Sequence, residues 1–201
     1  MANKVFTDPT YNSKSDGFGQ IELNQVAFRR DGRIEAQCAL DPTDFPGGDG
    51  RYAENGMILV VDKVNKKIKL PKKKTEVGHT DEFEDNVLYA LNYSTEHMYD
   101  ERARGLKNFK LGPDDFYPRL GYPSVGDRWT TNTIVFDTNT YADEAAIKTA
   151  VAAGTVYGIP STIGYTELVA DPSISPLILQ AVEYTTMPDG LPAIKFVVIK
   201  V

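Results

Sequence analysis

Short apolar, β-branched segments, each closed by turn residues, recur along the chain and dominate any prediction of its fold. The clearest pair covers residues 177–187 and 191–201, on either side of Met187-Pro188-Asp189-Gly190. Pro and Gly stand there at positions that β-turns favour, so we predict a terminal hairpin. Residues 129–136 also read as a β-branched strand, and shorter strands are expected at 155–158 and 163–170.

Two further hairpins are predicted in the first half of the chain. Residues 21–40 alternate in polarity around Asp31-Gly32, a dipeptide typical of two-residue hairpin turns. Residues 57–70 form a second apolar pair around Asn65-Lys66. Residues 86–99 fit a strand or a short helix, since periodicity does not separate the two for so short a segment.

One short α-helix is expected near residues 143–153. Asp143 and Glu144 suit the positive end of a helix dipole, the segment is rich in alanine, and Gly154 stands where helices commonly end. The predicted fold class is therefore mainly β, a β-sandwich or barrel-like structure, with this one helix.

The chain is expected to divide into three parts. Residues 1–20 are polar and without periodicity, which indicates an extended N-terminal arm or a disordered tail. Residues 21–112 would form a β-rich N-terminal module, and residues 113–201 a β-rich C-terminal module that carries the helix. The boundary lies in a loop-rich stretch with many Gly and Pro residues.

Composition narrows the class of protein. The 201 residues are 41% hydrophobic and 25% charged, as in ordinary folded domains. The single cysteine, Cys38, excludes an internal disulfide, and its alternating context predicts a core residue and not a nucleophile. The start of the chain has no secretory signal and no stretch resembles a membrane span, so we expect folding in a reducing cytosol and no membrane partner.

Seven lysines are concentrated between residues 63 and 74. They indicate either a solvated edge hairpin that charges protect from aggregation, or a contact with an acidic partner surface. Nucleic acid is not expected, because the net charge is −6 and the lysines lack interleaved aromatic residues. The candidate partner contacts, in the arm and in this cluster, are Phe6, Tyr11, Phe18, Lys66, Lys67, Lys69, Lys72, Lys73 and Lys74.

No catalytic, metal or cofactor site is predicted. The chain has two histidines, His79 and His97, and no zinc, nucleotide-binding or nucleophile-elbow motif. A serine triad assembled from distant positions would need one of these histidines, and this hydrolase reading remains the third hypothesis. The aspartates of the loop at residues 41–49 suit Ca²⁺, although solvated loop carboxylates explain them better.

Three stretches carry a resemblance to a known group of proteins. They are Asp115–Leu120 with Val125–Thr133, the helix leading to Gly154 and Tyr157-Gly158, and Tyr184–Gly190 followed by Ala193–Phe196. Together they resemble tailed-phage head decoration, or auxiliary (cement), capsid proteins that accompany an HK97-type major capsid protein. The similarity covers roughly residues 86–201, and the N-terminal part has no counterpart.

This resemblance implies a non-enzymatic virion structural protein, assembled in the host cytoplasm and located on the capsid. Its expected partners are the major capsid protein and further copies of itself. The alternative is a carbohydrate- or surface-binding module of a phage fibre or tail accessory, in which Tyr residues and Trp129 would stack against sugars. Trp129, in its β-branched strand, is nevertheless expected to belong to the core.

Overall fold

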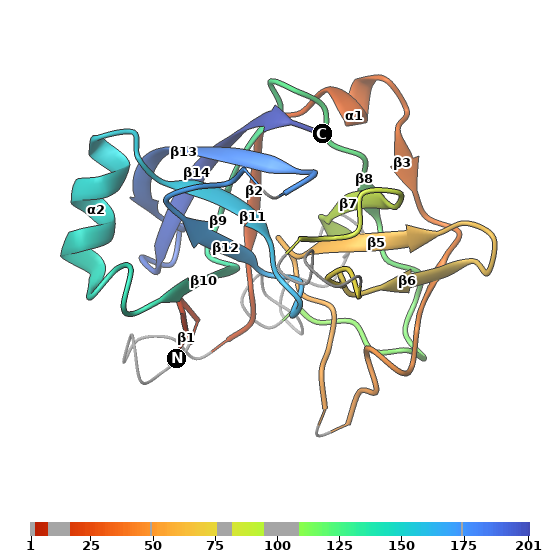
Figure 1. The fold of residues 1–201 in the computed structure, drawn as a ribbon. Coiled ribbons are helices and arrows are strands. Elements are labelled where there is room, and N and C mark those ends of the chain that lie inside the picture. Colours follow the sequence, from red (N-terminus) through yellow and green to blue (C-terminus); the bar gives the residue numbers. More distant parts are fainter. Residues whose placement is uncertain (1–2, 8–16, 49, 76–81, 95–108, 174) are drawn as a thin grey trace.

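Two β-sheets form the framework of the protein. The structure is a computed structural model that describes residues 3–7, 17–48, 50–75, 82–94, 109–173 and 175–201. Figure 1 shows the larger sheet beside α2 and the smaller sheet beside α1. The two sheets and the small helical content confirm the mainly β fold class.

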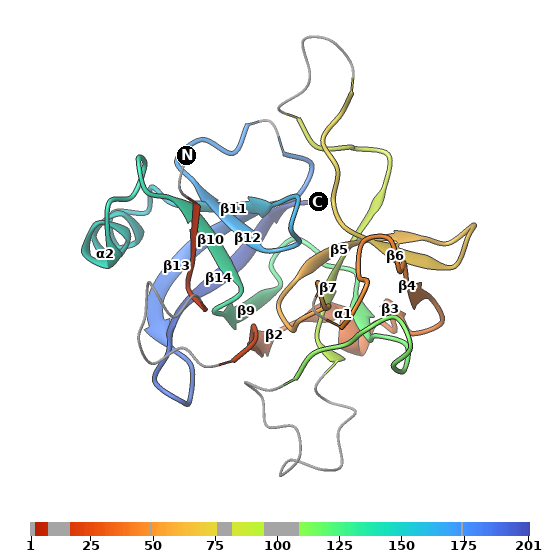
Figure 2. The same cartoon turned by 90° about the horizontal axis from the view of Figure 1, so that it is seen from below.

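The larger sheet has eight strands and curves into a half-barrel. Its order is β1 (Asn3–Val5), β10 (Ile134–Asp137), β12 (Thr166–Val169), β11 (Tyr157–Pro160), β13 (Ile178–Thr186), β14 (Pro192–Lys200), β9 (Arg128–Thr131) and β2 (Ile21–Gln25). Every neighbouring pair is antiparallel except β10 and β12. Its two edge strands, β1 and β2, both come from the start of the chain (Figure 2).

The smaller sheet has six strands. Its order is β3 (Ile34–Glu35), β8 (Leu120–Gly121), β7 (Leu88–Asn92), β5 (Ile58–Asp62), β6 (Lys67–Lys69) and β4 (Ala39–Leu40). Only the pairing of β4 with β6 is parallel. Residues 88–92, for which the sequence allowed a strand or a helix, are thus a strand.

The division between the sheets does not follow the expected module boundary at residues 112 and 113. Strand β2 belongs to the larger sheet, which is otherwise built mainly from the second half of the chain, and β8 belongs to the smaller sheet. Each sheet therefore takes strands from both sides of the expected boundary.

Two hairpins and the helix form as the sequence predicts. Strands β13 and β14 pair over their length around the turn that ends in Gly190, and β5 pairs with β6. Helix α2 spans Glu144–Ala152, and its N-cap residue Asp143 accepts a hydrogen bond from the Ala146 N–H at 2.8 Å. Gly154 follows the helix with a φ of +71°, a conformation that glycine adopts at low cost.

The predicted hairpin over residues 21–40 is wrong. Strand β2 pairs with β9, β3 pairs with β8 and β4 pairs with β6, so the three segments never meet as a hairpin. A short helix, α1 (Ala27–Arg30), turns the chain after β2, and the Asp127 carboxylate accepts the Ala27 N–H at its start. Phe28 is fully buried, which holds this helix in place.

The single strand predicted over residues 129–136 is also wrong, because the chain changes position in the sheet at Asn132 and Thr133. Strand β9 ends at Thr131 and β10 begins at Ile134, and the two have different neighbours. The Asn132 side chain accepts the Gln20 N–H at 2.6 Å, and the Thr133 hydroxyl donates to the Asn55 carbonyl. These bonds compensate for the interrupted ladder.

The N-terminal arm is only partly as expected. Residues 3–5 form β1, and Phe6 is 1% exposed and packs edge-on against Phe136 at 5.9 Å between ring centroids. Phe6 is therefore a core residue, and its assignment as a partner contact is corrected: its large apolar ring fills the half-barrel. Residues 8–16, including Tyr11, lie outside the described part of the chain.

Two clusters of buried side chains form the core, and each draws on both sheets. The first fills the half-barrel and reaches the smaller sheet through Ile58 and Leu91. The second lies against the smaller sheet and includes Val135 from the larger one, together with Tyr165, the residue before β12. Cys38 is in this second cluster, as predicted, and burial raises the pKa of its thiol to about 11.

Candidate partner-binding groove

The lysine hairpin, defined here as residues 63–74 around the β5–β6 turn, stands on a buried apolar base. On β6, Ile68 is fully buried, while Lys67 and Lys69 lie on the opposite face. Lys66 occupies the turn with a φ of +52° and is exposed. The hairpin thus presents lysines to solvent on a backbone that the core holds in place.

Several of these lysines have partners. Lys69 Nζ lies 2.7 Å from Asp62, and Lys74 Nζ lies 3.1 Å from Glu82 and 2.9 Å from Asp85. Hydrogen bonds from Asn65 and Lys69 hold the pKa of the Asp62 carboxyl well below its usual range.

Two other lysines of the hairpin lie over aromatic rings. Lys63 lies over the Tyr122 ring at 4.9 Å, and Lys73 over the Phe83 ring at 5.8 Å. For Lys66, Lys67 and Lys72, no salt bridge or ring contact is found within the described residues.

Phe18, the remaining candidate contact, is half-buried on a separate surface. Its ring lies 6.3 Å from that of Tyr52, and Lys110 Nζ lies 4.8 Å from its centroid. Phe18 does not line any of the pockets beside the lysine hairpin that are described below. The predicted contacts therefore separate into the core residue Phe6, the Phe18 surface, and the hairpin lysines.

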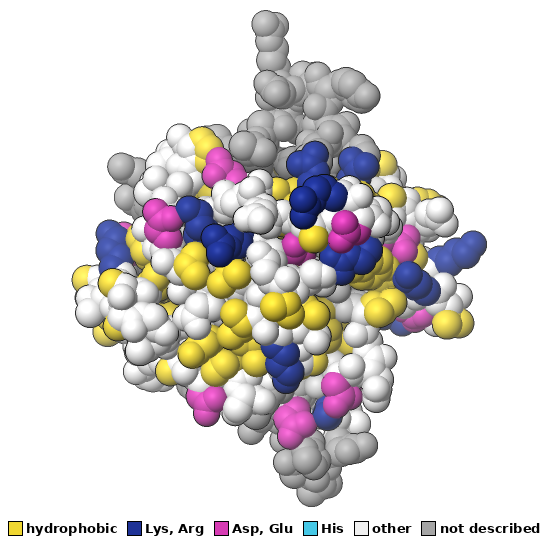
Figure 3. Space-filling model, turned by 90° about the horizontal axis from the view of Figure 1, so that it is seen from above, with side chains coloured by type: hydrophobic (Ala, Val, Ile, Leu, Met, Phe, Trp, Pro, Cys, Tyr) yellow, Lys and Arg dark blue, Asp and Glu magenta, His cyan; other side chains and the backbone are white. Residues whose placement is uncertain are grey.

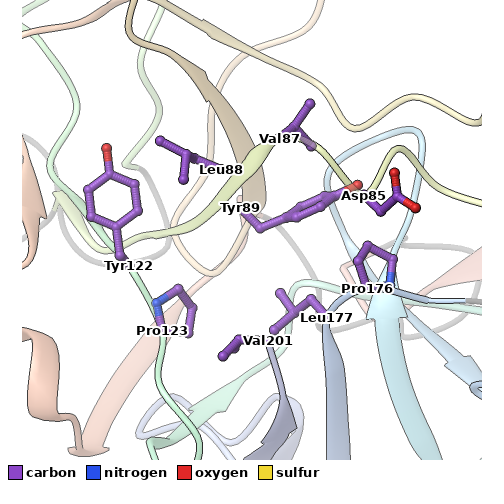
Figure 4. A pocket seen from close by; sticks show the side chains of 9 residues that line it. All are labelled: Asp85, Val87, Leu88, Tyr89, Tyr122, Pro123, Pro176, Leu177 and Val201. Atoms are coloured by element: carbon purple, nitrogen blue, oxygen red, sulfur yellow. The ribbon is translucent and has the colours of Figure 1, made fainter.

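An apolar pocket of about 250 Å³ lies where the two sheets meet. Figure 4 shows its lining: Leu88 and Tyr89 at the start of β7, Tyr122 after β8, Leu177 before β13, and Val201 after β14. We call it the central pocket. Four segments that are far apart in sequence form its walls, so no local motif marks it.

Two shallower hollows adjoin the central pocket on either side. One, of about 490 Å³, shares Val87 and Leu88 with it and adds Lys63, Lys69 and Lys72. The other, of about 230 Å³, shares Asp85 and Pro176 and adds Lys74 and Lys200. The three together form what we call the groove. Figure 3 shows hydrophobic side chains crossing the middle of the upper face, with lysine and arginine side chains around them.

A buried carboxylate, Glu54, ties the two sheets together away from this groove. Its side chain accepts hydrogen bonds from the Gly19 N–H at 2.5 Å and the Tyr165 hydroxyl at 2.8 Å. Its carbonyl accepts a bond from the Asn92 side chain at 2.8 Å. Burial raises the pKa of the Glu54 carboxyl, although its hydrogen bonds from Gly19 and Tyr165 and the charges of Lys110 and Arg51 oppose the shift. Sequence reasoning missed this residue, because nothing local distinguishes it from a solvated glutamate.

We expect the Glu54→Gln variant to gain stability relative to the wild type as pH rises. The raised pKa means that the folded protein retains the Glu54 proton better than the unfolded chain, so this contribution is full below pH 4.5 and is lost as pH rises through the folded-state pKa. Glutamine does not ionise. Urea unfolding of both proteins from about pH 4 to about pH 8 measures the difference.

A second variant checks the cause of this pH dependence. Tyr165→Phe removes a hydrogen bond that favours the charged carboxylate, so the loss of stability should extend to higher pH. A difference between Glu54→Gln and wild type that stays constant across the range contradicts the assignment.

The described residues also bear on metal binding, on membrane spanning and on the hydrolase hypothesis. No group of three or more His, Cys, Asp or Glu side chains is arranged to hold a metal ion there. Nor does any helix in the described ranges have the length and apolar character needed to cross a membrane. His79 and His97, on which a serine triad would depend, lie outside those ranges.

Comparison with known proteins gives no further assignment. No protein family, curated protein or solved structure matches the chain.

Proposed function

We propose that this chain is a structural component of a virion that decorates a capsid lattice, with the major capsid protein as its partner. The observation that carries the proposal is the groove, in which an apolar pocket between the sheets is bordered by the lysine hairpin. Apolar centres with polar margins are the usual anatomy of protein interfaces. The resemblance of residues 86–201 to decoration proteins supplies the class of partner.

The proposal gives a role to the exposed lysines of the hairpin, whose backbone is held by the buried side chain of Ile68. Hairpin lysines at the margin of a contact attract an acidic surface and orient it, while contributing little energy each. A lattice presents many identical sites, so copies bound side by side can be retained although single contacts are weak. Salt would then weaken attachment, because exposed charges are screened within about 8 Å at physiological ionic strength.

Recognition of carbohydrate or a cell surface remains the second candidate, but without Trp129. Trp129 is fully buried and offers no stacking platform. Phe116 and Tyr117 are instead 44% and 55% exposed and adjacent in sequence. A glycan array on which Phe116→Ala and Tyr117→Ala abolish all binding would favour this function over the capsid.

The direct test is sedimentation of the purified protein with particles assembled from the major capsid protein, at low and at moderate salt. Lattice binding predicts co-sedimentation that saturates at a fixed ratio and declines with salt. A protein that stays in the supernatant at every particle concentration refutes the proposed function.

Charge reversal on the hairpin tests which surface is used. We expect Lys66→Glu with Lys67→Glu to weaken particle binding about 10-fold at low salt and about 2-fold at moderate salt. The matched control is Arg30→Glu with Arg128→Glu, which makes the same change in net charge at exposed positions on α1 and β9. Equal losses for both pairs would show that net charge, and not the hairpin, governs attachment.

A further inference from the structure

The polar groups in the walls of the central pocket already have partners within the protein. The Tyr89 hydroxyl donates to the Glu84 carbonyl at 2.6 Å, and the Tyr122 hydroxyl to the Glu35 carboxylate at 3.2 Å. Pro123 and Pro176 line the pocket and have no backbone N–H to donate. The pocket therefore offers mainly apolar contact to whatever enters it.

The size of the pocket fits one large side chain. Its volume of about 250 Å³ is below the roughly 300–1,000 Å³ of cavities that enclose small-molecule ligands or cofactors. At its margin, Leu88 is 45% and Val201 63% exposed, so apolar surface remains uncovered. Interface hot spots are commonly single aromatic or aliphatic anchors that fill such a pocket.

The charges of the adjoining hollows favour an acidic occupant. Among the carboxylates that line them, Asp62 is bridged to Lys69, and Glu82 and Asp85 are bridged to Lys74. Lys63, Lys72 and Lys200 line the same hollows, and none of them forms a salt bridge in the described part of the chain.

These three lysines are also spread along the groove. Lys63 and Lys72 lie on one side of the central pocket, and Lys200 lies on the other. The hollow beside the hairpin has three lysines, Lys63, Lys69 and Lys72, against the two carboxylates of Asp62 and Glu84, so positive charge is in excess there. In the hollow that contains Lys200, two lysines face two carboxylates and the charges balance.

We propose that the groove binds an extended acidic segment of a partner protein, which places one aromatic or leucine side chain in the central pocket and carboxylates beside Lys63 and Lys72. This inference rests on the proposed function for the identity of the partner and adds the chemistry of the contact. One apolar pocket with an adjoining hollow on either side matches a linear peptide better than a flat surface.

The experiment uses a fluorescently labelled peptide in which a single phenylalanine is flanked by aspartates, and a second peptide with alanine in its place. We expect saturable binding of the first to the full-length protein, at least about 10-fold tighter than the second. Amide NMR signals of Leu88, Tyr89 and Leu177 should shift on addition of the phenylalanine peptide. Equal binding of the two peptides, or shifts confined to other residues, overturns the proposal.

Two matched variants locate the site. Leu88→Glu puts a carboxylate at the mouth of the pocket and should weaken binding of the phenylalanine peptide at least about 10-fold. Val182→Glu changes a valine that is 47% exposed on β13, outside the pocket lining, and should leave the affinity within about 2-fold. Circular dichroism checks that both variants fold. If Val182→Glu weakens peptide binding as much as Leu88→Glu does, the pocket assignment is wrong.

The same variants separate failure of this inference from failure of the proposed function. If capsid particles bind the wild type and Leu88→Glu equally, the function stands and the groove proposal is refuted. If the peptide binds as described but particles never co-sediment, the groove proposal stands for another acidic partner and the capsid function is refuted.

Discussion

Replacing Trp129 with alanine is expected to lower the free energy of unfolding by about 3–5 kcal/mol. Trp129 is fully buried in β9, with β14 on one side and β2 on the other, and belongs to the cluster inside the half-barrel. Alanine removes most of its buried apolar surface and leaves a cavity that the surrounding strands fill only in part. No larger side chain is fully buried in the described residues.

Trp129→Phe is the matched control. The indole N–H of Trp129 has no hydrogen-bond partner in the described structure, so phenylalanine removes no polar contact and retains a large apolar ring. Its cost should be about 1–2 kcal/mol. Because Trp129 is the single tryptophan, unfolding in urea must be followed by circular dichroism and not by tryptophan fluorescence. A cost for alanine below about 1 kcal/mol would contradict the buried position.

Replacing Phe28 with alanine is expected to have an effect of similar size, about 3–5 kcal/mol. Phe28 projects from α1, is fully buried, and its ring centroid lies 5.3 Å from that of Tyr93. Gly121 lies beneath it on β8, where a Cβ atom would overlap the Phe28 ring. The ring therefore occupies space that a glycine keeps open, between α1 and the smaller sheet.

A double-mutant cycle measures this packing directly. Gly121→Ala alone should cost about 1–3 kcal/mol by overpacking. In the Phe28→Ala background, the new methyl group enters the cavity, and its cost should fall to about zero or become a small gain. Equal costs of Gly121→Ala in the two backgrounds, measured by urea unfolding, would show that the two residues do not compete for space.

Elements specified by neighbouring residues were predictable from the sequence. The β13–β14 hairpin, the β5–β6 hairpin and helix α2 each contain their own turn or cap signals, and each forms. The groove lysines that belong to the hairpin were also visible, because they lie close together between residues 63 and 74, whereas Lys200 was not predicted as a contact.

Elements that depend on distant partners were not predictable in the same way. Residues 21–40 alternate like a hairpin, but Phe28 is fully buried against Gly121, and β2 and β3 pair with the distant strands β9 and β8. The break between β9 and β10 depends on Gln20 and Asn55, which approach only in the folded state. Local patterns contain no record of either contact.

The central pocket was missed for a related reason. Its lining joins the start of β7, the ends of β8 and β14, and the residue before β13, and none of these is unusual in its own segment. Only the sheet topology brings them together. Likewise, the polar residues around Phe6 indicated an exposed arm, but the Phe6 side chain lies in the core.

The placement of β1 and β2 at opposite edges of the larger sheet has a consequence for synthesis of the protein. Ile21 pairs with Thr131, which lies 110 residues later (131 − 21), and Val5 pairs with Val135. Contacts between residues so far apart form late and slowly, because long loops must close first. The half-barrel therefore cannot be completed on the ribosome until β14 has left the exit tunnel. Until β9 and β10 have been synthesised, β1 and β2 remain without their partners and accessible to chaperones.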